Sequence, residues 1–205
     1  MMTSMRFQPI IVPGWKNSGP DHWQSRWQQV LPHAVRVEQT DWDHPTRTEW
    51  VGALSAAIDA ATCPVLLVAH SLGCVTSAAV PTALRQKIAG ALLVAPADVE
   101  RANAPQCLRD FVPIARQPLP FQSVVVASDN DPYCSVPRAR EFADAWGSRF
   151  VVVPAGGHLN AEAGLGDWPQ GWKMLTALRR RCAWRVTTPP PRIAPLHRLS
   201  AVNSH

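Results

Sequence analysis

A serine at position 71 stands where an apolar stretch meets a run of small residues. The segment reads Val65-Leu-Leu-Val-Ala-His-Ser-Leu-Gly73, and small residues continue after it. A strand, a sharp turn and a helix in this order strain the serine backbone and project its hydroxyl outward. The usual pattern is G-x-S-x-G, and Ala69 at its first position is a sterically mild change. We predict that Ser71 is a nucleophile; an ordinary turn with a capping serine is the alternative.

Two backbone N–H groups are expected to stabilise the oxyanion that forms when a serine attacks a carbonyl group. The first is that of Leu72, because the start of the following helix places this N–H beside Ser71. The second is predicted at Trp15, in the loop Val12-Pro-Gly-Trp-Lys-Asn-Ser-Gly19, where Gly14 permits close backbone approach. The alternative for this loop is a glycine turn that opens a helix. The phosphate-binding patterns G-x-x-x-x-G-K-[ST] and G-x-G-x-x-G are absent from the sequence.

A serine hydroxyl needs a base, and the chain holds seven histidines. His158 follows an apolar run through Pro-Ala-Gly-Gly, whose two glycines let the backbone turn tightly. His70 adjoins the serine, so its side chain should point elsewhere, and His33 and His44 have no motif around them. We predict that His158 is the base, with a solvent-exposed histidine in a turn as the alternative.

The base needs a carboxylate that accepts its second ring hydrogen. Asp129 and Asp131 both follow the apolar run 123–127, in Ala-Ser-Asp-Asn-Asp-Pro. We prefer Asp131, because a loop at a strand end needs a few residues to reach the histidine, and Pro132 fixes the turn just after it. Asp129 is then expected to cap the turn. The chain order serine, acid, histidine is that of α/β-hydrolases.

Short apolar runs alternate with helix signals along the chain. The runs are continuous rather than alternating, as in strands buried on both faces of a parallel sheet; they span residues 9–12, 34–37, 65–69, 91–95, 123–127 and 150–153. A cap at Ser18 and a capping box at Thr46 and Glu49 each precede a helical apolar stripe. Further helices are expected over residues 72–80, 137–146 and 168–184. The pattern predicts a three-layer α/β-hydrolase fold with a mostly parallel sheet of about six strands and no lid domain.

Two segments are assigned more loosely. Residues 96–120 contain five prolines and little periodicity, and we expect them to form part of a substrate pocket, since loops after strands do so in this fold class. Trp15 and Trp23 are candidates to line that pocket. Residues 1–185 are expected to form the hydrolase domain, and residues 186–205, which include three consecutive prolines, a disordered tail.

Composition narrows the class of protein. The formal net charge is +5, but residues from Arg179 onward hold six arginines and no acid, which leaves 14 basic against 15 acidic residues elsewhere. The body therefore lacks the basic surface of a nucleic-acid-binding protein. Five cysteines without a C-x-x-C pair argue against disulfides and zinc. No apolar run is long enough for a signal peptide or a membrane span. We therefore expect a cytoplasmic protein that binds no membrane, metal or cofactor.

Several motifs together resemble the small serine hydrolases related to retinoblastoma-binding protein nine, a branch of the α/β-hydrolase superfamily. The resemblance covers residues 10–172 and rests on Val-Pro-Gly14, Asp21-His-Trp23, Trp27, His70-Ser-Leu-Gly73, Asp131-Pro-Tyr133, Gly157-His-Leu-Asn160, Gly164-Leu-Gly166 and Trp168. It implies a lidless hydrolase fold, no cofactor, and a triad of Ser71, Asp131 and His158. The proline-rich tail lies outside the family pattern.

These observations predict a serine hydrolase that cleaves a small carboxylic ester, thioester or amide through an acyl-enzyme, with a small acyl compound as its partner. The alternative is a non-catalytic protein-interaction module on a hydrolase fold. Three reacting groups in the required order favour the enzyme, because a pure binder does not need all of them.

Overall fold

The computed structural model describes residues 7–187, and six strands in that range form a single parallel sheet. Their order across the sheet is β2-β1-β3-β4-β5-β6. The strands are β1 (Gln8–Val12), β2 (Val35–Arg36), β3 (Val65–His70), β4 (Ile88–Val94), β5 (Gln122–Ser128) and β6 (Arg149–Val153). All six expected strands are therefore present, and β2, at the edge, is shorter than predicted.

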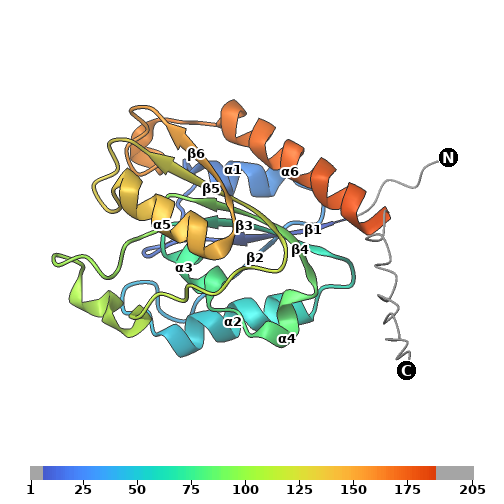
Figure 1. Cartoon of the computed structure of the whole chain (residues 1–205), viewed down its shortest axis with the longest axis horizontal. Helices are drawn as coiled ribbons and strands as arrows, with labels where there is room; N and C mark the ends of the chain where they lie inside the picture. Colours follow the sequence, from blue (N-terminus) through green and yellow to red (C-terminus); the bar gives the residue numbers. More distant parts are fainter. Residues whose placement is uncertain (1–6, 188–205) are drawn as a thin grey trace, which may run out of the picture.

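Helices cover both faces of the sheet, which makes the three layers visible in Figure 1. Helices α1 and α6 lie on one face, and α2, α3, α4 and α5 pack on the other. The helices are α1 (Trp23–Val30), α2 (Arg47–Asp59), α3 (Leu72–Ala78), α4 (Thr82–Arg85), α5 (Val136–Trp146) and α6 (Pro169–Thr187), with the short 3-10 helices η1 (Gln106–Phe111) and η2 (Ala161–Ala163). The predicted α/β-hydrolase fold class is confirmed.

Successive residues of the central strands enter two separate hydrophobic cores. Val65, Leu67 and Ala69 of β3 face the core beneath α2, α3 and α5, whereas Leu66 and Val68 face the core beneath α1 and α6. Every one of these five side chains is fully buried. Burial on both faces explains why the strands read as continuous apolar runs rather than as alternating ones.

The chain reverses its direction of travel across the sheet beside β1. From β1 it crosses to β2 on one side, and then returns to β3 on the other side, from which β4, β5 and β6 follow in order. The carboxyl ends of β1 and β3, in register from Gln8 and Val65 to Val12 and Ala69, meet at this switch point. In open α/β sheets the crevice outside such a point is where ligands bind. The strand order alone therefore indicates a ligand site at the carboxyl ends of β1 and β3.

Local signals placed most helix ends correctly. Thr46 caps α2, as predicted: its hydroxyl accepts the Glu49 N–H over 3.3 Å and donates to the Glu49 carboxylate over 2.7 Å. The expected cap of α1 at Ser18 is wrong: a turn closed by the His22 N–H and the Gly19 carbonyl precedes the helix, and His22 caps it by accepting the Gln24 N–H over 3.1 Å. Most of the predicted tail, residues 188–205, lies outside the described residues. Among the described helices, none is long and apolar enough to cross a membrane.

Candidate active site

Ser71 occupies a strained turn between β3 and α3. Its backbone angles are φ 53° and ψ −121°, a region that residues other than glycine seldom adopt. Its N–H donates to the Val94 carbonyl of β4 over 2.9 Å, which holds the turn against the sheet. Gly73 has to be glycine, since a Cβ there would lie 2.3 Å from the Val12 carbonyl oxygen. The turn thus depends on close contact between the ends of β1 and β3.

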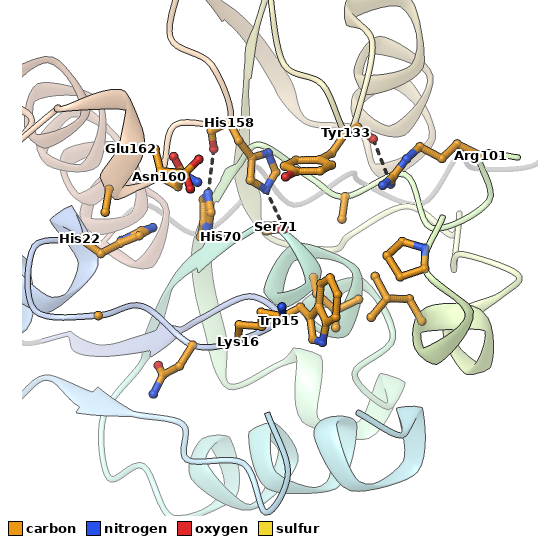
Figure 2. Close-up of a pocket in the computed structure, with 17 residues that line it drawn as sticks. Trp15, Lys16, His22, His70, Ser71, Arg101, Tyr133, His158, Asn160 and Glu162 are labelled. Carbon is orange, nitrogen blue, oxygen red and sulfur yellow. Dashed lines mark hydrogen bonds between the residues drawn. The ribbon is translucent and has the colours of Figure 1, made fainter. Parts of the chain in front are cut away.

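The hydroxyl of Ser71 is hydrogen bonded to the imidazole of His158, 87 residues further along the chain. The distance from His158 Nε2 to Ser71 Oγ is 2.9 Å (Figure 2). On the other side of the ring, Nδ1 lies 3.0 and 2.9 Å from the two carboxylate oxygens of Asp131. The Asp131 side chain is only 2% exposed and also accepts the Tyr133 N–H over 2.8 Å. The three predicted side chains therefore meet in one hydrogen-bonded chain.

Asp129, the rival acid, faces a different group. Its carboxylate accepts the Ala155 N–H over 2.7 Å. The neighbouring Ser128 and Asn130 accept the N–H groups of Gly156 and Gly157 over 2.9 and 2.7 Å. Three successive side chains at the end of β5 thus bind three successive backbone N–H groups just before His158. This arrangement fixes the histidine loop beside the acid loop, and Asp129 contributes to it without touching the imidazole.

A cavity of about 430 Å³ opens over Ser71, and Trp15, Leu72 and His158 are among its lining residues. Leu72 begins α3, so its N–H has no acceptor within the helix. The backbone N–H of Trp15 likewise makes no hydrogen bond within residues 7–187. The loop that carries it touches the nucleophile, since a Cβ on Gly14 would lie 2.7 Å from Ser71 Cβ. Both predicted oxyanion donors therefore lie at the cavity with free N–H groups.

Other sequence expectations about the cavity meet different outcomes. The segment after β4 contributes Ala97, Arg101, Pro105 and Leu108 to the wall, as expected for residues 96–120. Trp23 does not line the cavity; it is buried in the core beneath α1 and α6.

Residues 7–187 contain no group of three or more histidine, cysteine or acidic side chains placed to hold a metal ion.

Two further histidines, His22 and His70, line the cavity beside His158 (Figure 2). Burial, followed by the positive charge of Arg36, lowers the pKa of His22 to about 3. Burial also lowers the pKa of His70 well below its ordinary value. Both rings are therefore neutral near pH 7 and do not oppose a positive charge on His158. His70 Nε2 donates to the His158 carbonyl oxygen over 2.9 Å, so it positions the backbone of that residue.

Side chains of α1 anchor the same region, and no sequence motif pointed to their contacts. The buried Gln24 donates to the carbonyl oxygens of Val12 and Val68 over 3.1 and 2.9 Å, which ties the ends of β1 and β3 together. Trp23 and Trp27 each donate their indole N–H over 2.8 Å to backbone carbonyls, those of Leu159 and Asp167. The loop that carries His158 is thus seated on α1.

Solved structures of hydrolases resemble this chain. A YdeN-like hydrolase from Pectobacterium atrosepticum is 36% identical, with 86% of this chain and 92% of that chain covered and a TM-score of 0.77. The ydeN gene product of B. subtilis is 20% identical, covers 84% and 98% of the two chains, and has a TM-score of 0.68. Est1E from Butyrivibrio proteoclasticus, solved with ferulic acid, shares the fold at 12% identity, with 91% and 92% coverage and a TM-score of 0.62.

A comparison with curated protein sequences gave no match. The narrower resemblance to hydrolases related to retinoblastoma-binding protein nine stays a prediction. A family model described as serine hydrolase matches residues 9–177, a range that includes every residue of the hydrogen-bonded chain. The chain therefore belongs to the serine hydrolase family.

Proposed function

We propose that the protein hydrolyses small carboxylic esters, and by the same chemistry thioesters or amides, through an acyl-enzyme on Ser71. The observation that carries this proposal is the position of the His158 ring, which bridges the Ser71 hydroxyl and the Asp131 carboxylate. A serine hydroxyl becomes a useful nucleophile when a base of this kind can take its proton.

In the first half of the reaction, His158 Nε2 takes the proton of the Ser71 hydroxyl while Oγ forms a bond to the substrate carbonyl carbon. The carbonyl π electrons move onto the oxygen, where the N–H groups of Trp15 and Leu72 stabilise the negative charge. Asp131 keeps the Nδ1 hydrogen in place and balances the charge on the imidazolium. When the carbonyl re-forms, the bond to the leaving group breaks, and that group takes the proton from Nε2.

In the second half, a water molecule replaces the leaving group. His158 takes a proton from the water while its oxygen attacks the acyl carbon, and a second oxyanion forms at the same two N–H groups. Collapse of this intermediate breaks the bond to Ser71 Oγ, which recovers its proton from Nε2. A carboxylic acid is released, and the enzyme returns to its starting state.

The test is turnover of p-nitrophenyl acetate, together with labelling by a fluorophosphonate probe. Ser71→Ala should lower kcat by about 10³-fold or more and abolish labelling. The matched control is Ser55→Ala in α2, outside the cavity, where the hydroxyl is buried without a hydrogen-bond partner among the described residues. This control should keep wild-type turnover and labelling.

Two results would contradict the proposal. Unchanged turnover by a clean preparation of Ser71→Ala would remove the serine from the mechanism. Absence of turnover and of labelling in the wild-type protein would favour the interaction module, because a pure binder needs no reactive serine.

A further inference from the structure

Arg101 places a positive charge in the wall of the candidate catalytic cavity. Within residues 7–187 this guanidinium has no ion pair with a carboxylate. Its Nη1 instead donates to the backbone carbonyls of Asp98 and Tyr133, over 3.0 and 3.5 Å. A charged group at a cavity without an opposite charge is the kind of group that a ligand of opposite charge pairs with.

The nearby carboxylates are bound elsewhere. The Asp98 side chain pairs with Arg138, with 3.2 Å between its Oδ2 and the arginine Nε. Glu100 is bound by both Arg116 and Arg138. These contacts engage the two acids nearest to Arg101 in the chain, and they hold the backbone around it in place.

One nitrogen of the Arg101 guanidinium remains for a ligand. Nη2 makes no hydrogen bond within the described part of the chain, whereas Nε is buried without an acceptor there. A carboxylate oxygen that accepts from Nη2 would form a charge-assisted hydrogen bond with this cation. The group is also preorganised, because its carbon lies 5.2 Å from the centre of the Tyr133 ring.

Contacts between side chains connect Arg101 to the reacting atoms. The Tyr133 ring lies edge-on to the His158 ring, with centroids 4.6 Å apart, and His158 contacts Ser71. Figure 2 shows Arg101 beside Tyr133 on one side of Ser71, whereas Glu162 lies on the opposite side. A substrate anion near Arg101 therefore avoids Glu162, which among residues 7–187 is the acid that lines the cavity.

We propose that the cavity accepts esters that carry a free carboxylate, which pairs with Arg101 while Ser71 attacks the ester carbonyl. The inference rests on the proposed hydrolase function and narrows its substrates. The cavity of about 430 Å³ is large enough for a short dicarboxylic monoester or an acylated hydroxy acid.

The experiment compares kcat/KM for matched anionic and neutral esters. Monoethyl adipate is compared with ethyl methyl adipate by ethanol release, and 4-acetoxybenzoate is compared with its methyl ester. These pairs place the charge on the acyl side and on the alcohol side. We expect the anionic member of at least one pair to be preferred about tenfold, the size of one charge-assisted hydrogen-bonded pair.

Variants assign the preference to a residue. Arg101→Gln should lower the anionic-to-neutral ratio about tenfold, and Arg101→Lys should keep part of it because the charge remains but the planar guanidinium is lost. Arg109→Gln is the matched control, since Arg109 is exposed in η1 and does not line the cavity; it should leave the ratio unchanged. If Lys16→Gln, which removes the other cation of the cavity wall, abolishes the preference instead, the assignment to Arg101 is overturned.

A measurement on the wild-type protein decides the matter even where Arg101→Gln fails to fold. Adipate should inhibit p-nitrophenyl acetate turnover competitively, with an inhibition constant about tenfold lower than that of adipamide. Equal inhibition, together with no preference in either ester pair, would overturn the inference. Serine-dependent turnover of p-nitrophenyl acetate under that outcome would leave the proposed hydrolase function standing, whereas its absence would remove both.

Discussion

Replacing Asp131 by asparagine tests the acid through the tautomer of its partner. The Tyr133 N–H binds Asp131 Oδ1 over 2.8 Å, so the oxygen of the new side-chain amide has to remain on that side. The amide NH₂ then faces His158 Nδ1, which lies 2.9 Å from Oδ2 in the native protein. Because a donor now faces Nδ1, the ring hydrogen moves to Nε2, and the lone pair that accepts the Ser71 proton is lost.

The magnitude follows from the two functions that are removed together. The wrong tautomer blocks proton transfer, and the charge that balances the imidazolium is absent; such a change lowers kcat by about 10⁴-fold, or about 5.5 kcal/mol. Asp129→Asn is the matched control, since its amide oxygen can still accept the Ala155 N–H. This control should cost less than about tenfold in kcat.

The assay is kcat for p-nitrophenyl acetate on both variants, with thermal unfolding measured to show that each is folded. Equal activity of Asp131→Asn and wild type would refute the tautomer argument. The reverse ranking of the two variants would assign the acid to Asp129 and contradict the geometry.

Two further predictions concern the elements that hold the site. Gly73→Ala should lower the free energy of unfolding by about 1–3 kcal/mol and reduce turnover, since the new Cβ would meet backbone oxygens at 2.3 and 2.6 Å. Gly52→Ala is the control, because nothing lies within 4 Å of the new Cβ; it should raise the free energy of unfolding by about 0.5–1 kcal/mol. Urea unfolding of the two variants measures both changes. His22, with a folded pKa of about 3 against an ordinary 6.5, leaves the folded state with fewer bound protons between those values. Stability should therefore fall as pH is lowered from 6.5 towards 3, by up to about 1.4 kcal/mol per pH unit. Urea unfolding at several pH values should show a shallower slope for His22→Asn, which keeps a capping side chain, and an unchanged slope for the exposed His33→Asn. A slope of His22→Asn equal to that of wild type would contradict the argument.

Features that local sequence encodes were predictable. The turn at Ser71 is visible because a buried strand, a serine and a glycine required by close packing follow one another in the chain. The Gly-Gly turn before His158 and the proline after Asp131 are local signals of the same kind. Parallel strands then bring their carboxyl ends together, so the meeting of these three residues follows from the fold class.

Features that depend on contacts between distant segments were not predictable. Gln24 is a polar residue on a helix, and nothing near it in sequence shows that it binds the ends of two strands. The binding of residues 155–157 by Ser128, Asp129 and Asn130 needs the register of two loops. The start of α1 was misplaced for a related reason, since the turn between Gly19 and His22 delays the helix and local sequence does not show that Ser18 binds the Gln24 side chain.

The indole side chains that seat the His158 loop also give the protein an optical property. The rings of Trp23 and Trp27 lie 4.6 Å apart, and Trp168, from the end of that loop, lies 5.0 Å from Trp23 and stacks on Trp27 at 5.8 Å. Electronic transitions of rings held this close and at fixed angles couple to one another and produce circular dichroism in the near ultraviolet. Because Trp168 lies at the end of the histidine loop, loss of that signal would report separation of this loop from α1 without any substrate.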